Sequence, residues 1–529
     1  MPCDIVGTFT QGLSMQTEDT AAQKSVMSIM SVLLPAVSWL WSLQALLVGV
    51  VVIITAVLWR RSSTAGLPPG PRGLPLVGNL FSLSKANALV YQEWSQKYGD
   101  VFTIYAFSQP RVVLNGFSAI REALVTNADV FSSRPSIPVL GSPDQSAKGL
   151  LFEPYTPRYK EHKKFTMSAL RDFGVGKKSM EGKILEEAQA LSDVISKKEN
   201  QAFCISQLLK NATCNVICSL VFGSRYEYDD NKCQELLLMI DETFSIKRHH
   251  MLPFLFPAAG IIPSLKKGSE GFLNNQIKLR GHIREEIAKH KETFDPNDIR
   301  DFMDAFLLEA KKREGDENST FTEEQHVEIV RQLFLAGTDT TATTLHWAVL
   351  FMILHPDIQQ KVQQEIDSVL GPNQDPSMEH RSQMPYTEAT LSEISRMAAT
   401  APMATRHFTT SDIFFRGYHI PKATGVEVNI WSVLYDPQLW PEPYKFDPTR
   451  FLDDSGKFAR REEMIMFSMG RRLCPGERLS KAELFLFFTS LLQRFTFKPP
   501  EGCPMPSAEG VFGLVHFPAP FQLVAEARK

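Results

Sequence analysis

The sequence predicts a mainly α-helical protein with small β-sheets. Apolar residues recur at helical spacing among charged ones over residues 177–202 and 274–292, and a third, mostly apolar stretch covers Glu323–Leu354. Runs that are typical of strands are short by comparison, and they are Val101–Tyr105, Arg111–Leu114 and Gly425–Asn429. With 529 residues, the chain can bury a large core between such elements.

The stretch Glu323–Leu354 is too long and too apolar for an exposed helix, so we expect it to run through the core. Pro356 lies just beyond its end, where proline commonly follows a helix. Ile358–Leu370 and Leu479–Leu492 predict two further helices, of which the first stops at a glycine.

Net charge and cysteine usage exclude several classes of protein. The net charge is -3, so no overall positive field would attract nucleic acid, and we expect no nucleic-acid partner. Seven cysteines, an odd number without a CxxC pair, indicate neither a disulfide framework nor a zinc ribbon. Cys214 and Cys218 lie one helical turn apart, and we expect them to pack as small apolar residues.

An apolar segment near the N-terminus predicts a membrane anchor. Ser25–Trp59 contains no charged residue and is long enough to span a bilayer. Arg60 and Arg61 follow the segment whereas only Lys24 precedes it, so the positive-inside rule places the rest of the chain in the cytoplasm. We expect a single-pass protein of the endoplasmic reticulum membrane. Its expected parts are a luminal tail (1–24), the anchor (25–59), a basic and proline-rich hinge (60–79) and a large folded domain (80–529).

Two further segments are rich in proline. Leu67–Asn79 has four prolines and three glycines, which exclude a helix and favour a rigid spacer or a simple linker. Met251–Leu265 is apolar with proline breaks. We interpret it as a loop that dips into membrane lipid near the substrate entrance.

A cysteine near the C-terminus lies in a sequence that suits a metal ligand. Cys474 stands between Gly470 and Gly476, which permit tight turns, and it precedes the predicted helix 479–492. Arg471 and Arg472 and the start of that helix would favour the thiolate. An inert buried thiol is the alternative interpretation.

The segment Phe467–Gly476, FSMGRRLCPG, resembles the haem-binding loop of the cytochrome P450 superfamily. Three other motifs follow the order of that superfamily: AGTDTT at 336–341, EISR at 393–396 and FDPTRF at 446–451. The resemblance covers nearly the whole chain, and FLFFTSLLQRF is closest to animal microsomal members of family two. It implies the cytochrome P450 fold in a single catalytic domain.

The resemblance implies haem b with Cys474 as the axial iron ligand, a thiolate that favours cleavage of the O–O bond. It also implies that Glu393, Arg396 and Arg450 form a structural network rather than a chemical one. The residues expected around the haem are Phe467, Gly476, Arg472, His407, Arg134, Tyr159 and Lys163. The last two stand where the family usually has Trp and Arg, and Thr449 stands where it usually has Glu.

Oxygen activation is implied for the 336–341 segment. By the resemblance, Thr340 holds dioxygen and a water molecule, and Asp339 helps to deliver protons. Gly337 would leave room for oxygen against the helix. The alternative for Thr340 is a hydroxyl that bonds to the preceding helical turn. The expected substrate contacts are mostly apolar or small, and they are Phe152, Ala336, Thr341, Met403, Thr405, Leu514 and Val515.

The sequence therefore predicts a monooxygenase that inserts one atom of O2 into an apolar substrate such as a fatty acid, a steroid-like lipid or a xenobiotic. Electrons would come from NADPH through a diflavin reductase, which is a flavoprotein, or from cytochrome b5. The donor would dock on a basic face made by Arg158, Lys160, Lys163, Lys164, Arg471, Arg478 and Lys481. Two alternatives stay open: a haem-thiolate isomerase or dehydratase of oxygenated lipids, and a non-catalytic haem protein of the membrane. The acid–threonine pair favours the monooxygenase.

Overall fold

The structure is a computed structural model that describes residues 27–28, 43–52, 54, 66–74, 77–83, 86–107, 109–135, 149–246, 248–255, 257–371 and 374–528. The chain divides into two units, Met1–Ala65 and Gly66–Lys529. Most of the expected anchor, 25–59, lies outside the described residues. Within the described part of the chain, residues 43–52 are helical, and no helix combines the length and the apolar character needed to cross a bilayer.

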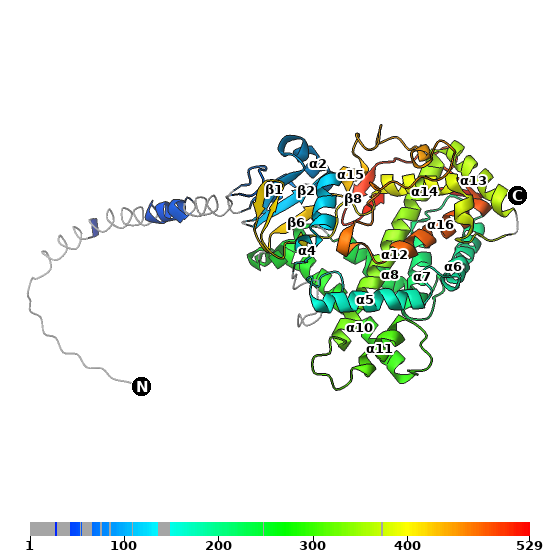
Figure 1. Ribbon diagram of the computed structural model, residues 1–529, viewed down its shortest axis with the longest axis horizontal. Helices are drawn as coiled ribbons and strands as arrows, with labels where there is room; N and C mark the ends of the chain where they lie inside the picture. The colour runs from blue at the N-terminus through cyan, green and yellow to red at the C-terminus, as the bar shows by residue number, and fades with distance from the viewer. Residues whose placement is uncertain are drawn as a thin grey trace, which may run out of the picture. The chain divides into compact units, whose positions relative to one another are not determined.

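The second unit is mainly helical, as predicted, and Figure 1 shows its helices around a smaller sheet region. The longer helices are α2 (Asn87–Tyr98), α5 (Pro157–Asp172), α6 (Lys178–Ser196), α7 (Ser206–Val221), α8 (Asn231–Phe244), α10 (Pro263–Glu292), α11 (Phe302–Lys312), α12 (Glu323–Leu354), α13 (Pro356–Leu370), α14 (Pro385–Ala398) and α16 (Glu477–Arg494). Shorter ones are α3 (Phe117–Arg121), α4 (Ala128–Phe131), α9 (Leu252–Leu255) and α15 (Trp431–Leu434).

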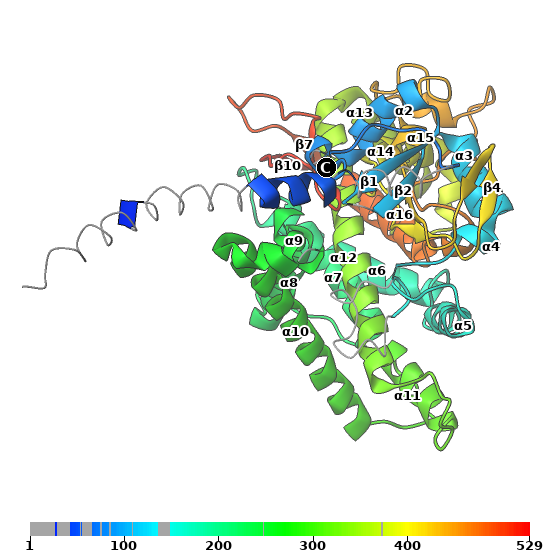
Figure 2. The same cartoon turned by 90° about the vertical axis from the view of Figure 1, so that its left-hand side faces the viewer.

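Helix α12 has the predicted bounds and runs through the core against α7, α10, α14 and α16. Its N-terminus is capped by Thr322, whose side chain accepts a hydrogen bond from the amide of Gln325. It is buried on almost every side over its second half, which explains why its sequence lacks a polar face. Figure 2 shows α10 and α11 extending away from the sheet region at the other end of the unit.

The predicted strands form the main sheet. Its order is β1-β2-β6-β3, with strands β1 (Val101–Ala106), β2 (Gln109–Leu114), β6 (Gly425–Val428) and β3 (His407–Phe408). Small two-stranded sheets pair β4 (Ile413–Phe415) with β5 (Tyr418–Ile420), β7 (Phe495–Lys498) with β10 (Val524–Ala527) and β8 (Gly510–Phe512) with β9 (His516–Pro518).

The described part of the proline-rich segment packs on β1. The amide of Thr103 donates to the carbonyl of Pro69 at 3.0 Å, and the amide of Tyr105 donates to the side chain of Asn79 at 2.8 Å. A Cβ on Gly70 would lie 1.9 Å from the carbonyl oxygen of Thr103, so this approach requires glycine. The segment from Gly66 onward is thus part of the second unit.

Two expectations about helix limits are wrong. Helix α6 ends at Ser196 instead of residue 202, because Glu199 and Asn200 turn the chain at positive φ so that Phe203 can pair with Leu523. The expected loop Met251–Leu265 instead contains α9, a 3-10 turn at Pro257–Ile261 and the start of α10. Pro263 lies in the first turn of α10, where its fixed φ suits helix initiation.

The structure confirms that two cysteines of α7 pack as small apolar residues in the core. Cys214 and Cys218 lie on α7, both are fully buried, and their Sγ atoms are 3.9 Å apart. They pack with the apolar cluster that surrounds α12.

Candidate active site

A cavity of about 310 Å³ lies beside α12. It is lined by one face of α12, by α5, by Leu150 and Leu151, by the segment around Met403 and by the loop that carries Cys474. No Asp or Glu is among the described residues that line it. The cavity is thus apolar over most of its wall, with its charge confined to a few cations.

Cys474 lies on the cavity wall, in the loop that leads into α16. Its residue surface is exposed, and its amide donates to the carbonyl of Phe467 at 3.1 Å. Burial by the surrounding protein raises the pKa of the thiol, while hydrogen bonds from the amides of Gly476 and Glu477 act in the opposite direction. The thiol is therefore exposed to the cavity yet enclosed by protein, and a bound cation would be needed to hold it as thiolate.

The arginines beside Cys474 make their hydrogen bonds to groups other than the thiol. Arg471 binds Tyr155 and Asp129, and Arg472 donates to backbone carbonyls. Gly470 is required by its positive φ of 73° and by the carbonyl of Leu124, which a Cβ would approach to 1.9 Å. Gly476, by contrast, has φ −84°, and a Cβ there would make an ordinary contact of 3.8 Å with the Cys474 sulfur.

Thr340 and Ala336 lie on the wall of the same cavity as Cys474. The Thr340 hydroxyl donates to the carbonyl of Ala336 at 2.7 Å, which is the bond to the preceding turn that we considered as an alternative. Because the hydroxyl uses its proton in this bond, its oxygen can still accept a hydrogen bond from a molecule in the cavity.

Asp339 does not line the cavity. Its carboxylate is buried toward α7, where Oδ1 lies 3.3 Å from the Nζ of Lys210. Burial raises the pKa of Asp339, and the positive charge of Lys210 opposes this shift. Gly337 also faces α7, since a Cβ there would lie 2.4 Å from the Cδ1 of Ile217. The expectation that Gly337 makes room in the cavity is thus wrong: its missing side chain lets the two helices approach.

A cluster of cations lies at one end of the cavity. Arg134, Lys163 and Arg472 all line it, together with Tyr159, whose ring lies 3.5 Å from the guanidinium carbon of Arg472. Arg472 donates to the carbonyls of Ser132, Leu150 and Glu153, and Lys163 donates to the carbonyl of Arg471. None of the three cations forms an ion pair with a carboxylate among the described residues.

Electrostatics indicates that this end of the cavity suits an anion. Burial and the nearby charge of Arg472 lower the pKa of Arg134 to about 9, and burial lowers the pKa of Lys163. The buried Nε of Arg134 and Nε2 of His407 have no hydrogen-bond partner among the described residues. Burial also holds the pKa of His407 well below its usual range. Cations that lack a carboxylate partner here fit the two propionates of haem b, with Cys474 available for the iron.

The network predicted for Glu393 lies in the core. Arg396 binds Glu393 through two hydrogen bonds of 2.7 and 2.8 Å, and both side chains are fully buried. The Nε of Arg450 lies 3.4 Å from the same carboxylate. Arg396 also donates to the carbonyls of Leu434 and Pro443, so the network ties α14 to the long loop before Cys474.

The structure brings together only part of the expected substrate contacts. Ala336, Met403 and Thr405 line the cavity, whereas the other four do not. Thr341 faces α16, where its hydroxyl lies 3.4 Å from Glu483 and from Ser480. Leu514 is 63% exposed and Val515 is buried, on the turn between β8 and β9.

Sequence reasoning missed the regular stripe that α12 presents to the cavity. Gln332, Ala336, Thr340 and Thr344 are spaced by four residues, and all of them line it. Helical spacing from Thr340 alone predicts this stripe, because positions four apart share one face. Leu150 and Leu151 had no comparable signal, since their place depends on contacts distant in sequence.

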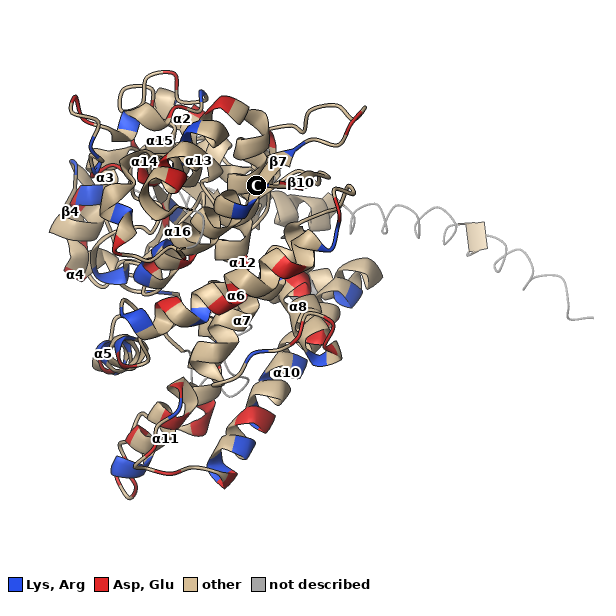
Figure 3. Cartoon of the chain, turned by 90° about the vertical axis from the view of Figure 1, so that its right-hand side faces the viewer, with Lys and Arg blue, Asp and Glu red and all other residues tan. Residues whose placement is uncertain are grey.

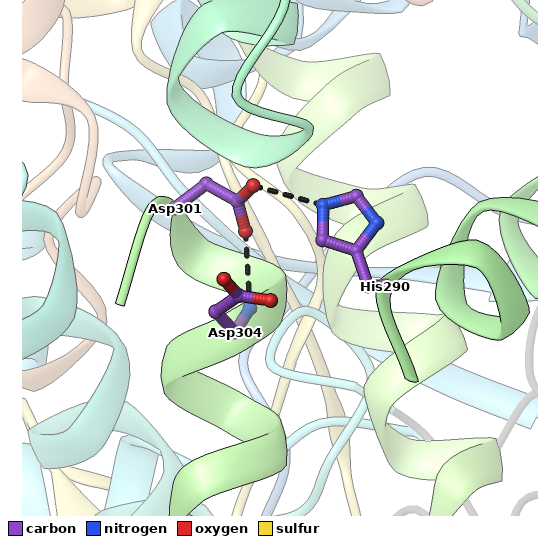
Figure 4. Close-up of side chains that lie close together, drawn as sticks. All are labelled: His290, Asp301 and Asp304. Carbon is purple, nitrogen blue, oxygen red and sulfur yellow. Dashed lines mark hydrogen bonds and ion pairs between the residues drawn. The ribbon is translucent and has the colours of Figure 1, made fainter. Parts of the chain in front are cut away.

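A second cluster of potential metal ligands lies between α10 and α11, where His290, Asp301 and Asp304 meet (Figure 4). All of its ligand groups are occupied by protein. The two ring nitrogens of His290 lie 2.8 Å from the carbonyl of Glu286 and from Asp301, and Arg300 binds Asp304. We therefore interpret this cluster as an ion-pair network that joins two helices.

Basic residues gather on α5 and around the loop of Cys474. The predicted set is Arg158, Lys160, Lys163, Lys164, Arg471, Arg478 and Lys481. Figure 3 shows Lys and Arg interspersed with Asp and Glu on this side of the second unit, most clearly along α10. Lys160, Lys164 and Arg478 are exposed, whereas Lys163 is partly buried at the cavity and Arg158 pairs with Glu153. The outward-facing part of the set is thus smaller than the sequence indicated.

Comparison with known proteins matches the sequence of this chain to one family. The family described as Cytochrome P450 matches residues 68–525. Cytochrome P450 2D26 of Rattus norvegicus is 41% identical over 92% of this chain and 98% of its own length. Cytochrome P450 2D28 of Mesocricetus auratus is 39% identical over the same shares. Cytochrome P450 2U1 of Mus musculus is 37% identical over 92% of this chain and 95% of its own.

Proposed function

The chain belongs to the cytochrome P450 family, and we propose that it is a membrane-anchored, NADPH-dependent monooxygenase of apolar organic substrates. Family membership implies haem ligated by a cysteine thiolate and an oxidoreductase that incorporates oxygen. The observation that carries the proposal is the shared cavity: Cys474 and Thr340 both line it, and buried cations line one end.

We assign the haem iron to Cys474 and the propionates to Arg134, Arg472 and Lys163, with Tyr159 as a further donor. His407 would donate to a propionate only as the imidazolium, because its Nδ1 proton is bound by the carbonyl of Phe131. When bound, the haem supplies reductive cleavage of dioxygen. The overall reaction consumes the substrate RH, O2, NADPH and a proton, and it yields ROH, water and NADP+. One oxygen atom enters the C–H bond, and two electrons from NADPH reduce the other atom to water.

The chain's own residues would position the reactants and move protons. Thr340 accepts a hydrogen bond from a guest in the cavity, because its own proton is held by Ala336. Asp339 is the adjacent acid, and Lys210 links it to Asp241, whose side chain is 37% exposed. The three side chains form a charged path from solvent to the residue beside Thr340, which suits proton delivery.

Substrate class follows from the wall of the cavity. Its wall includes apolar side chains such as Leu150, Leu333, Met403 and Ile430, and the described lining residues include no carboxylate. A cationic substrate would find no partner there, so neutral or anionic lipids and apolar xenobiotics fit best.

We also propose a protein partner and a membrane contact for this chain. Lys160, Lys164 and Arg478 are exposed on α5 and α16, and we assign this basic face to an acidic diflavin reductase or cytochrome b5.

Membrane attachment would use the apolar segment 25–59, with the catalytic unit on the cytoplasmic side of the endoplasmic reticulum. Ile261 and Ile262, 83% and 52% exposed, would add a second, reversible contact with lipid.

The ligand assignment is tested with the reduced, haem-loaded chain and carbon monoxide. A thiolate ligand produces a far-red-shifted Soret band, so Cys474→Ser should abolish this band. Cys503→Ser, an exposed cysteine outside the cavity, is the matched control and should retain it. Retention of the band in Cys474→Ser would show that another residue binds the iron.

Product analysis separates the monooxygenase from its alternatives. With reductase, NADPH and 18O2, a monooxygenase places one labelled oxygen in the product, whereas an isomerase or dehydratase incorporates none and needs no NADPH. A non-catalytic haem protein would show carbon monoxide binding without turnover of any lipid or drug tested. The intact Asp339–Thr340 pair favours the first outcome.

A further inference from the structure

Three methionine side chains line the cavity that also holds Cys474, and they come from three separate segments. Met167 lies on α5, Met403 on the chain before β3, and Met466 on the loop that leads to Cys474. Apart from Cys474, these thioethers are the only sulfur groups among the described lining residues. Because a thioether takes up an oxygen atom from peroxide, the position of each one determines whether it meets the oxidant.

We propose that Met403 is a self-oxidation site, at which hydrogen peroxide released inside the cavity converts the thioether into a sulfoxide. The inference rests on the proposed function, because a monooxygenase whose turnover is uncoupled is the source of the peroxide. It assigns a covalent modification to a residue that the resemblance placed only among the substrate contacts.

The chain around Met403 is attached to the face of α12 that carries Thr340. Thr344 lines the cavity one helical turn after Thr340, and its hydroxyl donates to the carbonyl of Thr340 at 2.9 Å. The hydroxyl of Thr400, three residues before Met403, lies 2.9 Å from the hydroxyl of Thr344. A β-bridge to Asn429 fixes the backbone of Met403 itself. Met403 is thus held on the part of the wall that adjoins the Thr340 face.

Met466 lines the same cavity from the chain that carries Cys474. The amide of Cys474 donates to the carbonyl of Phe467 at 3.1 Å, so Met466 directly precedes a residue that is bound to the cysteine. A haem iron has its cysteine ligand on one face and binds oxygen on the other. Met466 belongs to the ligand side, and peroxide formed on the oxygen side should therefore reach Met403 first.

The chemistry of this step needs no further reagent. Uncoupled turnover converts O2, NADPH and a proton into hydrogen peroxide and NADP+. A lone pair of the Met403 sulfur attacks one peroxide oxygen, so that an S–O bond forms while the O–O bond breaks. The proton of the transferred oxygen passes to the departing oxygen, which leaves as water. The sulfur has then lost two electrons, and the product is methionine sulfoxide.

A sulfoxide at this position would disturb the packing of the cavity wall. Met403 is partly buried and packs against two apolar clusters, one that contains Phe131 and Ile430 and one that contains Phe102 and Val113. The sulfoxide oxygen is a polar acceptor, which apolar surroundings satisfy poorly. Oxidation of Met403 therefore makes the wall more polar and less well packed.

The test uses the haem-loaded full chain with reductase, NADPH and 18O2, without substrate, followed by digestion and mass spectrometry. Catalase in the mixture removes peroxide that escapes into bulk solvent. We expect Met403 to carry one 18O atom and to be oxidised at least about threefold faster than Met466 and than Met505, which is 53% exposed. Thr340→Ala should release more peroxide and should increase the oxidation of Met403.

The haem-free chain with added peroxide gives a readout that involves no turnover. Exposure to solvent should then determine the rate, so Met505 should be oxidised first, and Met403 and Met466 should react within about twofold of each other. Met464, two residues before Met466, packs in the core and does not line the cavity, so it is the matched internal control and should stay reduced during turnover.

Two variants test the assignment by the mass of the intact protein. During uncoupled turnover, Met403→Leu should take up at least about twofold less 18O than wild type, because the apolar leucine has no sulfur to oxidise. Met464→Leu removes a thioether outside the cavity and should take up as much label as wild type.

Each outcome decides the proposal. Preferential 18O uptake at Met403 during turnover, with Met505 leading in the haem-free chain, supports it. Equal oxidation of Met403 and Met466 during turnover, oxidation of Met403 that catalase suppresses, or unchanged label in Met403→Leu overturns it. Failure of the proposed function would instead appear as NADPH that is not consumed. Peroxide added to the haem-loaded chain would then still decide whether Met403 reacts before Met466.

Discussion

The ammonium of Lys210 on α7 lies 3.3 Å from the buried carboxylate of Asp339 on α12, and it also binds Asp241 on α8. One lysine thereby joins three helices. It balances the charge of an acid that stands next to the threonine on the cavity wall. This ion pair allows α12 to carry a charged side chain inside the core.

Lys210→Met should therefore destabilise the protein. Removing one partner of a buried ion pair leaves the other charge without compensation, and we expect a loss of about 3 kcal/mol in the free energy of unfolding. Asp241→Asn, at the exposed end, should cost less than about 1 kcal/mol. Urea denaturation measures the free energy of unfolding of both variants. The double variant Lys210→Met/Asp339→Asn should recover part of the loss, and additive losses would contradict the pairing.

Thr340→Ala should uncouple electron use from product formation. The variant loses the hydroxyl on the cavity wall, so proton delivery becomes disordered and peroxide should form. We expect the ratio of product to NADPH consumed to fall about tenfold while haem binding is retained. Thr338→Ala is a matched control, because that hydroxyl also bonds to the preceding turn but is fully buried and does not line the cavity.

Haem affinity should decrease at alkaline pH. The pKa of Arg134 is lowered to about 9 by burial and by Arg472, so its charge is lost above this pH in the haem-free protein. A bound propionate favours the charged form, hence haem binding takes up a proton and weakens as pH rises through about 9. The rate of haem transfer from this chain to apomyoglobin, followed at increasing pH, measures the loss of haem affinity. Arg134→Leu should bind haem more weakly and lack this pH step, whereas Arg416→Gln, a partly exposed arginine, should behave as wild type.

The cluster of His290 predicts a second pH dependence, in stability. Burial alone would lower the pKa of His290, but its hydrogen bond to Asp301 and the charge of that carboxylate outweigh burial and raise it. A raised pKa means that the stabilisation is complete below the unfolded value of about 6.5 and is lost as pH rises through the folded value.

His290→Gln should therefore be less stable than wild type at low pH, and the difference should shrink as pH increases. Denaturation curves between about pH 6 and pH 9 measure it. His380→Gln, a histidine of the 3-10 turn before α14, is the control. A difference that is constant with pH would mean that the ring acts through packing only.

Charge reversal on α5 should slow electron delivery. Lys160→Glu combined with Lys164→Glu removes exposed positive charge, so turnover driven by the reductase should fall, most at low salt. Peroxide-driven turnover bypasses the donor and should be nearly unchanged. Equal loss in both assays would place the donor site elsewhere.

Much of the fold was predictable because its signals are local. The bounds of α12 and the strands β1, β2 and β6 follow from periodicity and from the proline that ends the helix. The error at α6 arose because its expected last turn is replaced by an isolated β-bridge between Phe203 and Leu523, two residues far apart in sequence. Periodicity carries no information about such a contact.

The amino-acid sequence by itself determined the family, the cysteine loop and the chemistry expected of Cys474 and Thr340, because motif residues and their spacing are properties of the chain alone. Only the tertiary structure decided where each side chain faces. Asp339, Gly337 and Thr341 adjoin Thr340 in sequence, yet they face α7 or α16, since successive residues of a helix point in different directions. Gln332 and Leu150, distant in sequence, meet at the cavity because packing, hydrogen bonding and burial are satisfied together there.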